Sequence, residues 1–147
     1  MTQPNDERQA SAAIDGKLTS PCPFCSLDES RIITRSYLVI ACWDAFPVSP
    51  GHTLVVPARH IASWSEATLD EKAAILAGID AARVHIDERF HPDGYNIGLN
   101  DGVAAGQTVM HLHVHVIPRY KGDVPDPRGG VRWVLGEKAV YWKAGAV

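Results

Sequence analysis

Three histidines near the C-terminal end of the chain, His111, His113 and His115, alternate with apolar residues. Alternation of this kind is typical of a β-strand, in which successive side chains point to opposite faces of the sheet. On a strand, the three imidazole rings would stand in one row, roughly 6.6 Å apart, while the apolar residues between them face the core. A row of imidazoles on a rigid element is positioned for chemistry.

The histidines alone leave three interpretations open: a solvated strand face, a metal site and a catalytic set. Two histidines at positions i and i+2 can share one zinc ion. In a catalytic set, one imidazole attacks the substrate and another handles the proton or the leaving group. The preceding Gly106-Gln107-Thr108 segment offers an amide, a hydroxyl and backbone N–H groups, which suit a phosphate or an oxyanion better than a metal cation. A neutral imidazole is also nucleophilic near pH 7.

Cys22 and Cys25 are separated by two residues, a spacing that serves either zinc binding or redox chemistry. A redox pair is expected to open a helix within a βαβ unit, whereas this pair precedes a strand-rich region. Zinc needs two further ligands, and His60 and His111 are better candidates than the histidines of the predicted helix. Cys42 lies within an apolar, strand-like run and is expected in the core.

Five β-strands are predicted by runs rich in β-branched, aromatic or alternating apolar residues. They span residues 31–34, 37–43, 52–56, 95–99 and 110–117. Pro118 is expected to end the last of them. The cluster of proline, serine and glycine at 47–51 predicts a turn.

One long helix is predicted to begin at a capping box, with Thr68 as the N-cap and Glu71 as the third helical residue. It is expected to end at 91–94. One apolar stripe of this helix should face a sheet, and its residues are Leu69, Leu76, Ile79, Ile86 and Phe90. These patterns predict an α+β domain built on an antiparallel sheet, with one long helix and a short helix.

Length and composition limit the class of protein. The chain has 147 residues, 46% of them hydrophobic, and a formal net charge of -3, which is ordinary for one globular domain and gives no reason to expect a nucleic-acid or membrane surface. The first 20 residues lack the apolar core of a secretory signal, and the longest apolar run, 37–43, is too short to span a bilayer. We therefore expect a cytoplasmic protein with an N-terminal tail over 1–20 and a single domain over 21–147 that has an extended C-terminal segment.

The segment from Gly106 to Ile117 resembles the signature of the histidine triad (HIT) family, His-φ-His-φ-His-φ-φ, where φ is apolar. The sequences Asn-Asp-Gly at 100–102 and Pro-Gly-His-Thr-Leu-Val-Val-Pro at 50–57 are also similar to family segments, in the same order. The resemblance covers residues 22–120. It is closer to the diadenosine-polyphosphate-hydrolase-like and fragile-histidine-triad branches than to the transferase branch, which has glutamine at the position of His115.

The resemblance implies a HIT-like fold and a nucleotide hydrolase that acts at the α-phosphate of a dinucleoside polyphosphate, a nucleoside phosphoramidate or a related conjugate. His113 would attack the phosphorus and form a nucleotidyl-histidine intermediate, and His115 would bind the scissile phosphate and the leaving group. The other implied contacts are Asp44 to the ribose hydroxyls, Asn100 beside the α-phosphate, and Gln107 and Thr108 to phosphate oxygens.

Zinc-containing members of the family bind the metal with two cysteines and two histidines, and this sequence has all four at matching positions: Cys22, Cys25, His60 and His111. The resemblance therefore implies one structural zinc ion per chain, and it also implies a homodimer. His52 is expected in a supporting or core position. Phe46 is a candidate wall for the nucleobase.

Two other functions stay open. The first is a nucleotidyl transferase or phosphorylase of the same chemistry, which passes the nucleotidyl group to phosphate or a sugar phosphate instead of water. A histidine at position 115 argues against it. The second is a zinc-containing nucleotide-binding protein whose turnover is incidental.

Overall fold

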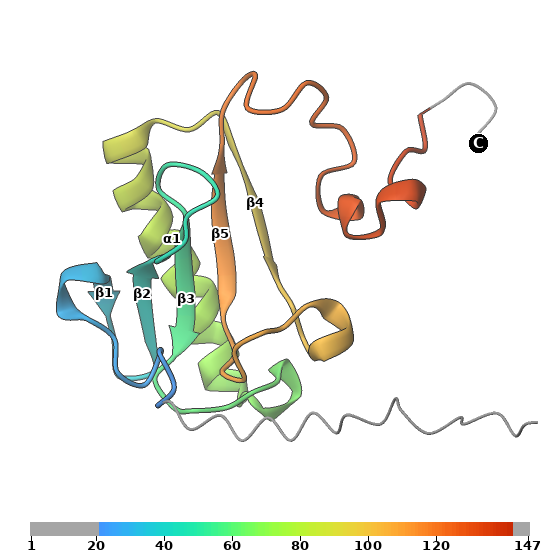
Figure 1. The fold of residues 1–147 in the computed structure, drawn as a ribbon. Coiled ribbons are helices and arrows are strands. Elements are labelled where there is room, and N and C mark those ends of the chain that lie inside the picture. Colours follow the sequence, from blue (N-terminus) through green and yellow to red (C-terminus); the bar gives the residue numbers. More distant parts are fainter. Residues whose placement is uncertain (1–20, 143–147) are drawn as a thin grey trace, which may run out of the picture.

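The computed structural model describes residues 21–142. The tail predicted over 1–20 lies outside the described residues. A five-stranded antiparallel sheet in the order β1-β2-β3-β5-β4 carries one long helix, α1, across one face (Figure 1). The strands are β1 (Ile32–Arg35), β2 (Val39–Trp43), β3 (Thr53–Pro57), β4 (Gly94–Leu99) and β5 (Val114–Arg119). The predicted α+β class with an antiparallel sheet is confirmed.

The two faces of the sheet bury different sets of side chains. The larger apolar cluster joins α1 to strand residues such as Val39, Val55 and Val116. The smaller cluster, on the opposite face, consists of Phe24, Cys42, Leu54 and Val56. Because Phe24 precedes β1, the N-terminal part of the described chain covers this second face. The prediction of Cys42 as a core residue is confirmed.

Helix α1 (Leu69–Phe90) begins at the predicted capping box. The Thr68 hydroxyl accepts the N–H of Glu71, and the Glu71 carboxylate accepts the N–H of Thr68. The helix ends at His91, whose backbone is left-handed with φ 50° and ψ 55°. Both helix ends therefore lie where the local sequence predicts them.

The predicted apolar stripe of α1 is wrong at Leu69 and Leu76, which are 83% and 62% exposed. The helix instead buries a face that combines isoleucines with two small residues: Ile75, Gly78, Ile79, Ala82 and Ile86. A Cβ atom on Gly78 would lie only 3.0 Å from Cγ1 of Val55. The glycine therefore allows the helix to pack closely on β3, and a stripe drawn through large residues alone misses this face.

Strand β5 begins later than predicted, at Val114, so only the third histidine of the row, His115, lies within it. The backbone N–H of Leu112 donates to the carbonyl of Ile61 at 2.6 Å. This bond holds the preceding residues against the segment that follows β3. The alternating pattern therefore starts before the strand does.

Pro118 does not stop β5 as predicted, since it pairs with Tyr95 of β4. The pairing of β5 with β3 ends earlier, at Val116. At Pro118 the strand has a neighbour on one side only, which is a position where a strand tolerates proline.

The short helices among residues 21–142 are all 3₁₀ helices: η1 (Glu29–Arg31), η2 (Trp64–Glu66), η3 (Val103–Ala105) and η4 (Gly130–Lys138). The C-terminal segment that contains η4 lies beyond β4, at the end of the sheet away from β1 (Figure 1), and η4 contacts β4. No helix in this described range combines the length and the apolar content that a membrane span requires.

Candidate active site and metal centre

The second and third histidines of the row lie side by side on the sheet face opposite α1. His115 is paired with Leu54 of β3 and Gly98 of β4, and Leu54 belongs to the apolar cluster of that face. His113 lies just before β5 and is 6% exposed. The ring centroids of His113 and His115 are 5.1 Å apart.

One hydrogen bond fixes the tautomer of neutral His113. Its Nδ1 lies 2.8 Å from the backbone carbonyl oxygen of His111. Because a carbonyl oxygen only accepts, Nδ1 carries the proton and Nε2 keeps its lone pair. The ring also packs against Phe24, with centroids 5.1 Å apart. The imidazole therefore presents an unprotonated nitrogen in a fixed orientation.

The ring of His115 is held by its contact with His52. Nε2 of His52 lies 3.0 Å from Nδ1 of His115, while Nδ1 of His52 accepts the backbone N–H of Val48 at 3.3 Å. The His52 ring therefore bridges the backbone of Val48 and the ring of His115, and it fixes the orientation of the His115 ring.

The Asp44 carboxylate approaches the other end of His52, with Oδ2 3.3 Å from Nδ1. Burial lowers the pKa of His52, and the nearby charge of Asp44 offsets this only in part. Asp44, His52 and His115 could together offer three metal ligands. Asp44 and His115 contact opposite ring nitrogens of His52, so the three groups also form a line of polar contacts.

Burial, together with the neighbouring imidazoles of His113 and His52, lowers the pKa of His115 to about 4. The ring is therefore neutral near pH 7. It can donate a hydrogen bond to a negatively charged group there without itself being a cation.

Asn100 lines a cavity of about 460 Å³ together with His52 and His115. Asp44 lies next to this cavity through its contact with His52, and its Oδ1 accepts the backbone N–H of Phe46 at 2.8 Å. Phe46 is 87% exposed and is not in the cavity lining. Three of the predicted site residues, Asp44, Asn100 and His115, are thus brought together.

Gln107 and Thr108 lie away from this cavity. The side-chain amide of Gln107 accepts the N–H of Gly102 and donates to the carbonyls of Ala62 and Val109. It therefore ties the loop before β5 to the segment after β3. Thr108 is exposed and lines a separate cavity beside the metal-ligand candidates. Phosphate binding by these two residues stays a prediction.

The four predicted zinc ligands converge from three segments of the chain. Sγ of Cys25 lies 3.2 Å from Nδ1 of His60, and Sγ of Cys22 lies 3.4 Å from Nδ1 of His111. All four ligand atoms lie within 4.8 Å of one another. In a tetrahedral zinc site with sulfur and nitrogen ligands, these atoms are roughly 3.3–3.8 Å apart. The donor set and its spacing therefore fit zinc.

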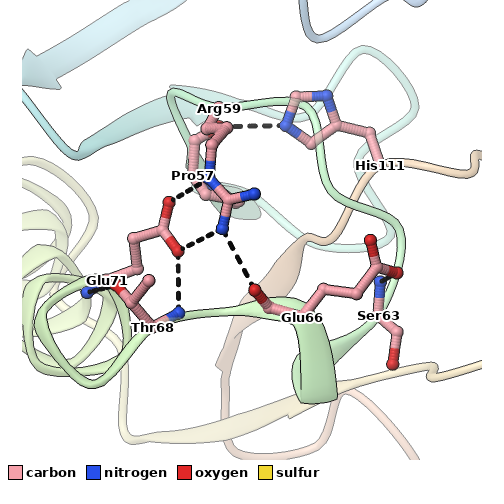
Figure 2. Close-up of polar contacts among 7 residues, drawn as sticks. All are labelled: Pro57, Arg59, Ser63, Glu66, Thr68, Glu71 and His111. Atoms are coloured by element: carbon pink, nitrogen blue, oxygen red, sulfur yellow. Dashed lines mark hydrogen bonds and ion pairs between the residues drawn. The ribbon is translucent and has the colours of Figure 1, made fainter.

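A polar network at the N-terminus of α1 holds the segment that carries His60 (Figure 2). Arg59 forms a bidentate ion pair with the buried carboxylate of Glu71, with both N···O distances 2.9 Å, and donates to the carbonyl of Glu66. The ion pair and the capping hydrogen bond lower the pKa of Glu71 to about 2. Sequence reasoning identified Glu71 as a cap and missed Arg59, since nothing in their spacing signals the pairing.

His111 links the candidate metal centre to the candidate active site. Its Nε2 donates to the carbonyl of Pro57 at 2.9 Å (Figure 2). Its Nδ1 is therefore unprotonated, and it faces the sulfur atoms of Cys22 and Cys25. The backbone carbonyl of the same residue accepts the Nδ1–H of His113. A metal bound here would hold the residue that orients His113.

Comparison with known proteins identifies relatives of this chain. A 39% identical stretch of 102 residues relates the chain to a Mycobacterium tuberculosis protein named AP-4-A phosphorylase, over 69% of this chain and 52% of that protein. A Schizosaccharomyces pombe protein named bis(5'-nucleosyl)-tetraphosphatase (asymmetrical) is 38% identical over 94 residues, or 64% of this chain and 52% of that protein. The chain matches about half the length of these two relatives.

The crystal structure of a zinc-bound histidine triad family protein from Mycobacterium smegmatis has the same fold, with a TM-score of 0.59 and 34% identity. The similarity covers 70% of this chain and 79% of that one. The sequence model of the HIT domain matches residues 27–122, which is more than half of the chain. This match, together with the histidine row and the sheet that carries it, shows that the chain belongs to the histidine triad (HIT) family.

Proposed function

We propose that this protein is a nucleotide hydrolase that acts at the α-phosphate of a dinucleoside polyphosphate, a nucleoside phosphoramidate or a related conjugate. The observation that carries the proposal is the pair of adjacent imidazoles: His113 has an unprotonated Nε2, and the ring centroid of His115 lies 5.1 Å from that of His113. The names of the two relatives, AP-4-A phosphorylase and bis(5'-nucleosyl)-tetraphosphatase, support dinucleoside polyphosphates as the substrate class.

In the first step, Nε2 of His113 attacks the α-phosphorus. A nitrogen–phosphorus bond forms while, in a dinucleoside polyphosphate, the bond from phosphorus to the bridging oxygen breaks and the nucleoside polyphosphate departs as an anion. Nε2–H of His115 stabilises the charge on the departing oxygen by a hydrogen bond. The positive charge that develops on His113 is stabilised by its Nδ1–H bond to the carbonyl of His111.

In the second step, water attacks the phosphorus of the nucleotidyl-histidine. The nitrogen–phosphorus bond breaks, its electron pair returns to Nε2 of His113, and the proton of the water passes to solvent. The products are a nucleoside monophosphate and the free enzyme. The remaining predicted contacts belong to this proposal: Asn100 beside the α-phosphate, Asp44 at the ribose hydroxyls, and Gln107 and Thr108 at phosphate oxygens.

The proposal includes one zinc ion per chain, held by Cys22, Cys25, His60 and His111. Four protein ligands fill a tetrahedral site, so the ion would serve as a structural cross-link. A homodimer is also part of the proposal. The edge strands β1 and β4 are the places where a second copy could extend or cover the sheet.

Trapping the intermediate tests the proposed chemistry. Wild-type protein is mixed with diadenosine tetraphosphate, quenched in base and weighed intact by mass spectrometry. We expect an adenylyl adduct on the wild type and none on His113→Ala, whose turnover should fall by at least about a thousandfold. His85→Ala, which removes an exposed histidine of α1, is the matched control. Equal labelling of wild type and His113→Ala would contradict the assignment of the nucleophile.

A phosphorylase is the second candidate, because the relative with that name is 39% identical over 102 residues. The two reactions differ in the acceptor of the adenylyl group. With diadenosine tetraphosphate and inorganic phosphate, hydrolysis yields AMP and ATP, whereas phosphorolysis yields ADP and ATP. Chromatography of the products at increasing phosphate concentration distinguishes the two, and our proposal requires AMP at every concentration.

A further inference from the structure

The chain between β3 and η2 supports the residues that lead into β5. Residues 57–62, which we call the supporting segment, offer three backbone carbonyls to them. The bonds are those of the Pro57 carbonyl with Nε2–H of His111 at 2.9 Å, of the Ile61 carbonyl with the backbone N–H of Leu112 at 2.6 Å, and of the Ala62 carbonyl with the side-chain amide of Gln107 at 2.8 Å. The position of the proposed nucleophile, two residues after His111, therefore depends on where this segment lies.

Arg59 fastens the supporting segment to the start of α1 (Figure 2). Its guanidinium donates to both carboxylate oxygens of Glu71 at 2.9 Å and to the carbonyl of Glu66 at 3.0 Å. Because a guanidinium is planar and its N–H groups point in fixed directions, hydrogen bonds to two elements define its orientation. The Glu71 side chain is only 4% exposed, so salt screens this ion pair less than one at the surface.

The ion pair is additional to the cap of the helix. The capping box consists of two hydrogen bonds between Thr68 and Glu71, and it is complete without Arg59. Oε2 of Glu71 accepts both the backbone N–H of Thr68 and the guanidinium, whereas Oε1 accepts the guanidinium. Arg59 thus forms a link that the helix does not need for its own start, and the other end of this link is the supporting segment.

Arg59 lies between two residues that contact the His111 ring. Two positions before it, Pro57 supplies the carbonyl that accepts Nε2–H of His111. The next residue, His60, packs its ring edge-on against the His111 ring, with centroids 4.9 Å apart and planes at 75°. The buried side chain of Ile61 anchors the far end of the segment in the core. A displacement of Arg59 would therefore move both supports of the His111 ring.

We propose that Arg59 is a positioning residue: through the Pro57 carbonyl it holds the His111 ring, and through the His111 backbone it fixes the orientation of His113. The second of these links is the bond from Nδ1–H of His113 to the carbonyl of His111 at 2.8 Å. That part of the inference rests on the proposed function, whereas the first part concerns the His111 ring alone.

Hydrogen exchange at the His111 ring tests the first part. The Nε2–H proton is buried and bonded to Pro57, so in protein with 15N-labelled histidine it should exchange slowly with water. Arg59→Met keeps a long side chain and removes the hydrogen bonds of the guanidinium. We expect it to accelerate the exchange by about tenfold, the effect of losing roughly one hydrogen bond. Arg59→Lys keeps the charge without the bidentate geometry, so it should give an intermediate rate, and it serves alone if Arg59→Met does not fold.

Thr68→Ala is the matched control. It removes the hydroxyl that accepts the backbone N–H of Glu71 and leaves the hydrogen bonds of Arg59 in place. The start of α1 is therefore weakened while the supporting segment keeps its attachment. We expect the melting temperature of Thr68→Ala to fall and its His111 ring proton to exchange at the wild-type rate.

Zinc affinity, measured by competition with a chelator, gives a second readout. His60 and His111 are two of the four candidate ligands, and loss of a residue that supports a metal ligand lowers metal affinity by about tenfold or more. We expect this loss in Arg59→Met and not in Thr68→Ala. The kcat for diadenosine tetraphosphate should also fall by about tenfold in Arg59→Met, with KM unchanged, because Arg59 is not among the predicted substrate contacts.

The outcomes separate this inference from the proposed function. If the His111 ring proton exchanges at the wild-type rate in both Arg59 variants, or as fast in Thr68→Ala as in Arg59→Met, the inference is overturned. If exchange accelerates only in the Arg59 variants and the wild type forms no adenylyl adduct, the proposed function fails while the role of Arg59 at His111 is supported. If the adduct forms and kcat is the same in wild type and Arg59→Met, the link from Arg59 to His113 is overturned.

Discussion

Protonation of a single residue, His115, is expected to affect the stability of the folded chain. Its pKa is lowered to about 4, from 6.5 for an unperturbed histidine. Between these two values the unfolded chain binds more protons than the folded chain. The free energy of unfolding should therefore fall as the pH drops from about 6.5 towards 4, and His115 should contribute no further change above about 6.5.

Thermal unfolding of wild type and His115→Asn at pH 7.5, 6 and 5 checks this expectation. Asparagine cannot titrate, so the loss of melting temperature on acidification should be smaller in His115→Asn than in wild type. His85→Asn, which changes an exposed histidine, should keep the wild-type dependence. An identical acid dependence in all three proteins would exclude His115 as a contributor.

The sequence predicts that His113 and His115 lie close together, but it does not predict that their rings bond to different partners. His113 and His115 occupy equivalent places in the alternating pattern, and a row gives no reason for their different hydrogen-bond partners. The difference depends on the backbone carbonyl of His111 and on His52, which lies 63 residues from His115 along the chain. Arg59, which acts only through tertiary contacts such as its ion pair with Glu71, leaves no pattern to recognise.

At the scale of elements, the end of α1 carries a small conformational strain. His91 is the only non-glycine residue among 21–142 with a positive φ, and its N–H caps the carbonyl of Asp87. Glycine adopts this conformation without steric cost. We expect His91→Gly to raise the free energy of unfolding by about 0.5 kcal/mol, measured by urea denaturation. His91→Ala removes the same imidazole and keeps a Cβ atom, so it should not stabilise. Equal stabilities of the two variants would refute the backbone explanation.

Local sequence signals predict the bounds and faces of an element well where local interactions determine them, and poorly where tertiary packing determines them. The capping box places the start of α1 correctly, because Thr68 and Glu71 satisfy each other without help from distant residues. The buried face of α1 was predicted wrongly, since close approach at Gly78 depends on the facing strand. The predicted start of β5 is too early, because the backbone N–H of Leu112 bonds to the carbonyl of Ile61, in a distant part of the chain.

At the scale of the whole molecule, the candidate metal centre joins three distant parts of the chain. Cys22 and Cys25 precede β1, His60 follows β3, and His111 precedes β5. Such a cross-link would hold the N-terminal segment, with Phe24, against the sheet face that carries His113. It would also fix the residue whose carbonyl orients the proposed nucleophile.

Removal of the metal should therefore affect stability and active-site order together. Cys25→Ser is expected to lower the zinc content from about one ion per chain to well below one half, and the melting temperature by about 5 °C or more. The His113 ring resonances in an NMR spectrum should broaden, because the loop that orients the ring loses its anchor. Cys42→Ala is the matched control, since Cys42 is fully buried and is not part of the metal-ligand cluster. It should lose stability while it keeps both the zinc and the His113 resonances. Full zinc content in Cys25→Ser, or an equally stable protein after chelation, would show that the chain does not depend on a metal at this site.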